Sequence, residues 1–148
     1  MGIADDLRQG HVELLEVIEG LTAEELNRPD TIGKWSARDV ILHLAMWDGE
    51  ALKALAVWRT GHEYDWAYAK DYLKFNEFWI GNFRHLGSSQ VIQMFNLVRN
   101  ALIADSSAVS EDIWSRRGGV PRWIYDVVID HTKHHLERLR AYRKSLGK

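Results

Sequence analysis

The sequence predicts an all-α protein, most simply a four-helix bundle with one short accessory helix. Apolar residues recur at helical spacing through most of the chain, and no segment resembles a run of strands. Proline, which interrupts helices, occurs only at Pro29 and Pro121. A chain of 148 residues can bury roughly 70% of its unfolded surface, so we expect residues 1–148 to form one domain with its own core.

The first half of the chain contains signals for two long helices and a short one. Apolar spacing predicts a first helix over residues 3–19. Thr22 begins a capping-box sequence that opens the accessory helix, which Pro29 ends. Ser36 is the expected N-cap of a second long helix that continues to about Gly61. The buried face of this helix is expected to comprise Val40, Leu44, Trp47, Ala51, Leu55 and Trp58.

The second half predicts three more segments of helix. We expect one over about residues 66–86 and another over about 88–105, capped by one of the two serines at its start. A polar loop follows over 106–119. The last helix covers 121–146, and proline is well tolerated in the first turn of a helix.

Composition excludes several classes of protein. The chain has no cysteine, which rules out a thiol nucleophile, a disulfide framework, an iron–sulfur cluster and a cysteine-ligated zinc site. The formal net charge of -2 lacks the basic excess of nucleic-acid-binding proteins. The longest apolar run, from Val40 to Trp47, is far shorter than the roughly 18 residues of a membrane span. We therefore expect a cytoplasmic protein that binds neither nucleic acid nor a membrane, since the N-terminus also lacks a basic signal-peptide region.

Two histidines occupy apolar positions of the last helix. His131 and His135 fall on its buried stripe, four residues apart, so their Cβ atoms lie about 5–6 Å apart on one face. That separation lets both imidazoles reach one ion at about 2.0–2.1 Å. The alternative is a pair of hydrogen-bonded core histidines. Each would need its own partner, because an unpaired buried polar group costs about 1–3 kcal/mol.

A third histidine favours the metal interpretation. His43 lies on the inward side of the second long helix, which can adjoin the last helix in an antiparallel bundle. Three neutral imidazoles from two helices bind a divalent ion and leave a coordination position open, as in catalytic sites. Two other metal-binding patterns are absent from the chain. It has neither His-Glu-x-x-His nor a Glu three residues before any histidine.

Two motifs resemble those of a known family. Segment 35–45 reads WSARDVILHLA and resembles the Trp-Ser-x-x-Asp-x-x-x-His-Leu motif of the DinB/YfiT-like superfamily of metal-dependent proteins. The His-x-x-x-His-Leu sequence at 131–136 resembles the motif in that family's last helix. The resemblance implies a four-helix bundle in which His43, His131 and His135 hold a divalent ion, often nickel, zinc or manganese. It also implies frequent dimers, and relatives that include thiol-dependent S-transferases, isomerases and hydrolases.

Three further residues are candidates for roles around the ion. Glu50 lies seven residues, or two helical turns, beyond His43. We interpret it as a surface residue, with the catalytic base as the alternative. Trp47 is expected near the mouth of the site and in the substrate pocket. His11 lies close to the apolar face of the first helix, and we interpret it as a boundary residue, with a substrate contact as the alternative.

Half of the aromatic residues lie between positions 64 and 83. Their spacing covers more than one helical face, which predicts core packing together with a homodimer interface and one or two rings beside the ion. These residues are Tyr64, Trp66, Tyr68, Tyr72, Phe75, Phe78, Trp79 and Phe83.

The leading functional hypothesis is a metal-dependent enzyme. A divalent nickel, zinc, manganese or iron ion would activate water or a thiol for attack on a small electrophilic molecule. Because the chain has no cysteine, the thiol would arrive as a low-molecular-weight cosubstrate. The alternatives are a non-catalytic helical dimer that binds or sequesters a small molecule, and a purely structural dimer.

Overall fold

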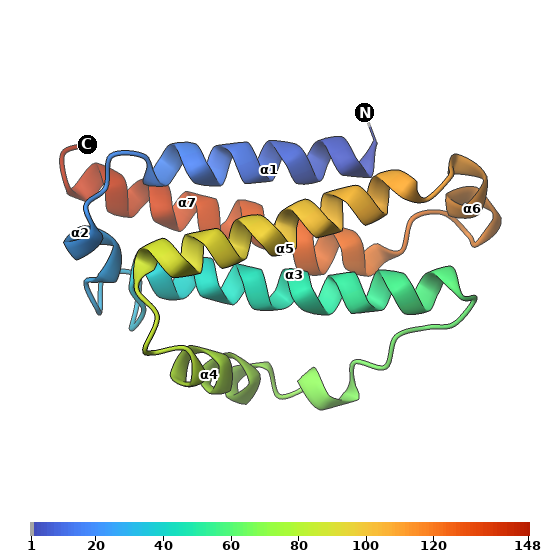
Figure 1. Ribbon diagram of the computed structural model, residues 1–148, viewed down its shortest axis with the longest axis horizontal. Coiled ribbons are helices and arrows are strands. Elements are labelled where there is room, and N and C mark those ends of the chain that lie inside the picture. The colour runs from blue at the N-terminus through green and yellow to red at the C-terminus, as the bar shows by residue number, and fades with distance from the viewer. Residues whose placement is uncertain (1) are drawn as a thin grey trace.

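The computed structural model describes residues 2–148 as helices joined by connections, and these residues form no strand (Figure 1). The prediction of an all-α fold is confirmed. Four long arms lie along the long axis of the molecule: α1 (Ile3–Ile18), α3 (Ala37–Arg59), α5 (Ser88–Ala108), and the last arm, in which a π-helical segment, η2 (Ile124–Ile129), continues directly into α7 (Asp130–Ser145).

The order of the arms brings α3 beside the last arm. In Figure 1, α1 and α7 run in one direction, whereas α3 and α5 run in the other. The connection between α3 and α5 therefore returns along the outside of α3, and it carries η1 (Ala67–Ala69) and α4 (Tyr72–Asn82). α3 contacts α5, η2, α7 and α4, so it lies at the centre of the fold.

Local capping explains where the first helices begin. The Thr22 side chain accepts a hydrogen bond from Glu25 N (3.1 Å) and starts α2 (Ala23–Asn27), while the Glu25 carboxylate accepts one from Thr22 N (2.9 Å). Ser36 and Asp39 form the same reciprocal box at the start of α3, with both distances 3.1 Å. Both caps are confirmed.

Other boundaries differ from those predicted. Residues 66–86 form η1 and the shorter α4 instead of one helix, because Asp71 caps α4 by accepting a hydrogen bond from Lys74 N (3.3 Å). The expected loop over 106–119 contains α6 (Glu111–Arg116), which Ser110 caps. Gly87, not a serine, is the N-cap of α5.

A buried ion pair lies between two apolar clusters of the core, one toward each end of the long arms. Arg99 and Asp48, each 1% exposed, join α5 to α3 through hydrogen bonds of 2.6 and 3.1 Å. Arg99 also donates to Thr132 Oγ1 of α7 (2.9 Å) and to Leu7 O of α1 (3.3 Å). A Cβ at Gly10 would lie 3.3 Å from both Arg99 Nη1 and Thr132 Cγ2, so glycine lets α1 approach this network, which links all four arms.

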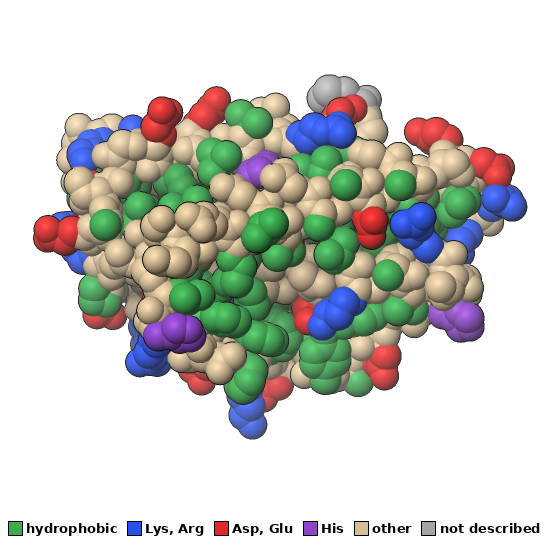
Figure 2. All heavy atoms as spheres, viewed as in Figure 1, with side chains coloured by type: hydrophobic (Ala, Val, Ile, Leu, Met, Phe, Trp, Pro, Cys, Tyr) green, Lys and Arg blue, Asp and Glu red, His purple; other side chains and the backbone are tan. Residues whose placement is uncertain are grey.

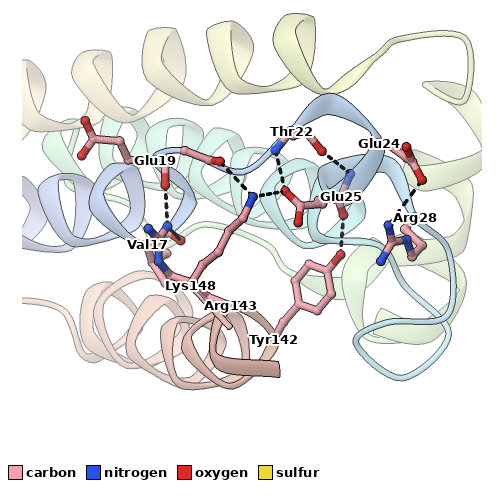
Figure 3. Close-up of polar contacts among 10 residues, drawn as sticks. Val17, Glu19, Thr22, Glu24, Glu25, Arg28, Tyr142, Arg143 and Lys148 are labelled. Carbon is pink, nitrogen blue, oxygen red and sulfur yellow. Dashed lines mark hydrogen bonds and ion pairs between the residues drawn. The ribbon is translucent and has the colours of Figure 1, made fainter. Parts of the chain in front are cut away.

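Tyr142 and Arg143 near the end of α7, together with Lys148 beyond it, hold α1 and α2 (Figure 3). Arg143 donates to Val17 O (2.9 Å) and to Glu19 O, the carbonyls that the last turn of α1 leaves free. Lys148 pairs with the Glu25 carboxylate at 2.7 Å, and Tyr142 donates to Glu25 O at 2.6 Å. These residues fasten the C-terminus of the chain to the bundle.

One face of the molecule carries an apolar area. Figure 2 shows hydrophobic side chains gathered over α4 and between α4 and α5. In η1 and α4, Tyr68, Tyr72, Leu73 and Phe78 are each more than half exposed. No helix within residues 2–148 has the length and apolar character required to cross a bilayer.

Candidate metal centre

Three histidines from two helices converge beside α4. His43 lies in the first half of α3, and His131 and His135 lie in the first two turns of α7. Their ligand nitrogens are all within 4.8 Å of one another. His131 Nε2 is 2.7 Å from His43 Nε2 and 3.1 Å from His135 Nε2. The structure thus brings together the three side chains that the sequence singled out. A π-helical segment just before His131 is also typical of functional sites.

The outer nitrogens of two rings face hydrogen-bond acceptors. His131 Nδ1 lies 3.2 Å from the carbonyl oxygen of Val127, and His43 Nδ1 lies 3.1 Å from Asn76 Oδ1. An oxygen acceptor requires the imidazole proton to be on Nδ1, which leaves Nε2 with a lone pair. The two Nε2 atoms then face each other at 2.7 Å without a proton between them. This contact is repulsive unless a cation binds there.

His135 has the fewest hydrogen-bond partners of the three rings. Its Nδ1 is buried and has no hydrogen-bond partner among the described residues. Its Nε2 lies toward His131 at 3.1 Å. Buried polar atoms usually have a partner, and an ion on Nε2 would leave Nδ1 without one as well.

Burial keeps the three imidazoles neutral. Loss of hydration is the main cause that lowers the pKa of each ring, to about 2 for His43, about 4 for His131 and about 3 for His135. The neighbouring histidines lower the pKa of His43 and His135 further. All three are therefore neutral at pH 7, which is the form that binds a metal ion.

The chemistry of the donors, and the spacing of two of them, fit a divalent metal. Two nitrogen ligands about 2.0–2.1 Å from a tetrahedral ion lie about 3.3 Å from each other, close to the 3.1 Å between His131 and His135. Three imidazoles suit ions such as zinc, nickel and iron, and they leave a coordination position free. His43, His131 and His135 would hold such an ion.

A cavity of about 320 Å³ opens beside this cluster. Trp47 lies in its wall, as expected, with its ring 6.5 Å from that of His131. Of the aromatic segment, Tyr72 also lines the cavity. The complete lining comprises His43, Trp47, Ala69, Tyr72, Asn76, Asp126, Val127 and His131.

Glu50 is placed differently from either expectation. It is 3% exposed, so its interpretation as a surface residue is wrong, but it does not line the cavity. One carboxylate oxygen accepts a hydrogen bond from Tyr64 (2.6 Å) and the other pairs with Lys53 (2.7 Å). Burial and this carboxylate raise the pKa of Tyr64, which keeps its hydroxyl a donor. Glu50 thus fastens the segment after α3 to the bundle.

His11 lies between α1 and α5. Its Nε2 is 2.7 Å from Asn96 Oδ1, and its ring contacts Phe95 edge-on at 5.5 Å. It is not among the residues that line the cavity. The structure therefore places it at the boundary of the core.

Sequence reasoning missed three residues of this region. Trp35 packs against the rings of His43 (4.8 Å) and His135 (6.4 Å), and its place eight residues before His43 in the first motif was a usable signal. Asp126 is the carboxylate that lines the cavity; it precedes His131 by five residues. Asn76 had no signal in the sequence, because its role depends on where α4 docks.

These features define a helical protein with a buried three-histidine centre beside a small cavity. Comparison with family models identifies the family: residues 6–139 match the model of the DinB superfamily. The chain belongs to the DinB superfamily, which confirms the resemblance found in the two motifs. No curated protein and no solved structure matches the chain significantly.

Proposed function

We propose that this protein is a metal-dependent enzyme acting on a small electrophilic molecule, by hydrolysis or by transfer of a low-molecular-weight thiol. A divalent nickel, zinc, manganese or iron ion held by His43, His131 and His135 would act as a Lewis acid and lower the pKa of water or of the thiol. The observation that carries the proposal is the pair of Nε2 lone pairs 2.7 Å apart at the edge of a cavity.

The cavity determines what kind of molecule fits. Its volume of about 320 Å³ is at the lower end of the range for small-molecule sites. Trp47, Tyr72 and Val127 provide apolar walls, and Asn76 provides an amide. These walls favour a small, largely apolar substrate whose reactive group lies toward the histidines. The expected homodimer, which would cover the apolar area over α4, remains a prediction. The cytoplasmic location also remains a prediction.

Asp126 is better placed than Glu50 to accept a proton. Asp126 lines the cavity, and its Oδ2 accepts a hydrogen bond from Arg122 (3.1 Å). Both oxygens of Glu50 are engaged by Tyr64 and Lys53. We therefore assign the proton-accepting role to Asp126 in this proposal.

Elemental analysis of untagged protein tests the metal site. We expect about one divalent ion per chain, lost in His43→Ala and His135→Ala because two imidazoles bind more weakly than three. His134→Ala is the matched control, since this exposed residue adjoins His135 and should retain the ion. At a metal concentration 100-fold above Kd, binding should stabilise the wild-type protein by about 2.7 kcal/mol.

Two results would contradict the proposed site. One is stoichiometric metal in His131→Ala, and the other is wild-type protein without metal after incubation with each ion and gel filtration. Either result would mean that the three histidines do not hold the ion that we assign to them.

A non-catalytic role as a small-molecule binder is the second candidate. It is favoured by the apolar walls of the cavity and by the engagement of both Glu50 oxygens. This function predicts ligand binding and thermal stabilisation that persist after chelation of metal. The enzyme predicts that turnover of thiol-transfer or hydrolysis substrates stops when metal is removed.

A further inference from the structure

The side chain of Asn76 contacts both the metal centre and the cavity wall. Its Oδ1 accepts a hydrogen bond from Trp47 Nε1 at 2.9 Å and lies 3.1 Å from His43 Nδ1. An indole nitrogen can only donate. The Asn76 atom that faces both rings must therefore be its oxygen, so Trp47 fixes the orientation of the amide.

The orientation of the amide decides which nitrogen of His43 carries the proton. With the oxygen beside Nδ1, the proton resides on Nδ1 and the lone pair of Nε2 points toward His131. A rotation of the amide by half a turn would present Nδ2 to His43 Nδ1. The imidazole proton would then move to Nε2, where it would block a metal ligand. In that orientation Nδ2 would also face the N–H of Trp47, donor against donor.

The tautomer of His131 does not depend on the orientation of an amide. Its Nδ1 faces the backbone carbonyl of Val127 (3.2 Å), which can only accept a hydrogen bond. The partner of His43, in contrast, is an amide with both an acceptor and a donor. The tautomer of His43 therefore depends on a second residue that fixes that amide.

We propose that Trp47 and Asn76 act as a positioning pair that selects the metal-binding tautomer of His43. Trp47 belongs to α3 and Asn76 to α4, so the selection requires α4 to be docked on α3. The inference rests on the proposed metal centre, but the tautomer can be measured without metal. Residues that orient ligand histidines typically change metal affinity about 10- to 100-fold when replaced.

Long-range ¹H–¹⁵N NMR of the metal-free protein at neutral pH tests this selection. We expect His43 as the Nδ1–H tautomer in the wild type and in Asn76→Asp, because a carboxylate accepts hydrogen bonds from both rings. In Asn76→Leu and Trp47→Phe, we expect a substantial Nε2–H population, because the fixed acceptor is lost or the amide is free to turn. Asn82→Leu is the matched control, since Asn82 is an exposed asparagine of the same helix.

Competition titrations with zinc give a second measurement. Asn76→Leu and Trp47→Phe should bind zinc about 10- to 100-fold more weakly than the wild type, whereas Asn76→Asp and Asn82→Leu should bind nearly as well. Trp47→Phe retains an aromatic ring in the core, and thermal unfolding of each variant checks that it is folded.

The outcomes separate this inference from the proposed function. An Nε2–H tautomer in the wild type, or an unchanged Nδ1–H tautomer in both Asn76→Leu and Trp47→Phe, would overturn the selection. A wild-type protein with the Nδ1–H tautomer that binds no metal would overturn the proposed function and support the selection.

Discussion

The molecule buries two polar clusters close together, and they differ in how their atoms are satisfied. In the Asp48–Arg99–Thr132 network, opposite charges meet and all three guanidinium nitrogens of Arg99 donate hydrogen bonds. In the histidine cluster, two lone pairs face each other and His135 Nδ1 has no partner among the described residues.

The difference shows that burial of polar side chains does not by itself identify a binding site. A cluster that satisfies its own charges and hydrogen bonds stabilises the fold, whereas one with unmet lone pairs beside a cavity is suited to a ligand. His131 and Thr132 are adjacent on α7 and contribute to different clusters. The network thus fixes the helix that presents two of the proposed ligands.

Breaking the network should have the largest effect on stability. Asp48→Ala leaves a buried guanidinium without its counter-charge, and we expect a loss of about 3–5 kcal/mol in the free energy of unfolding, measured by urea denaturation. The double variant Asp48→Leu/Arg99→Met removes both charges and should be closer to the wild type. A loss below about 1 kcal/mol in Asp48→Ala would mean that the two clusters do not differ as described.

The second-largest effect on stability is expected on acidification, and it comes from the histidine cluster. The folded chain keeps its three imidazoles neutral through lowered pKa values of about 2 to 4, whereas in the unfolded chain they bind protons below a pKa of about 6.5. Unfolding therefore takes up protons, and stability present above pH 6.5 should fall as the pH is lowered toward 4.

Urea denaturation of metal-free protein at pH 7 and pH 5 measures this effect. His43→Ala should lose less stability than the wild type over this interval, because one fewer proton is taken up on unfolding. Asn82→Leu, at an exposed position of α4, should behave like the wild type. Wild-type stability that stays constant or increases on acidification would show that the cluster is not neutral in the folded chain.

The smallest effect is expected for an exposed ion pair at the cavity. Arg122 is paired with Asp126 at 3.1 Å, and both side chains are more than half exposed. Arg122→Ala should change the free energy of unfolding by less than about 1 kcal/mol, again by urea denaturation. A loss as large as that of Asp48→Ala would remove the distinction between buried and exposed charges on which the comparison depends.

Much of the candidate centre was predictable because its signals are local. His131 and His135 share a face through their spacing in one helix, and His43 lies in a motif that begins at Trp35. Their convergence then required only that α3 adjoin the last arm, as it does. The helix starts at Thr22 and Ser36 were predictable for the same reason, since each cap involves residues three positions apart.

The features that could not be predicted depend on distant parts of the chain. Arg99 and Asp48 are 51 residues apart, and nothing near either one indicates an ion pair. Asn76 gains its role only when α4 docks beside Trp47. Residues 66–86 contain enough apolar residues for one helix, but Asp71 starts a new one and the chain before it forms η1.

The walls of the cavity come from the bundle and from the crossover between α3 and α5, which α3 holds through Tyr64 and Asn76. The histidines lie on α3 and α7, which the Arg99 network ties to the bundle, whereas Ala69, Tyr72 and Asn76 belong to the connection that carries η1 and α4. Substitutions at Ala69 or Tyr72 should therefore change the shape of the cavity without touching the hydrogen bonds that join Asn76 to Trp47 and His43. The crossover thus contributes both to the shape of the cavity and, through Asn76, to the surroundings of His43.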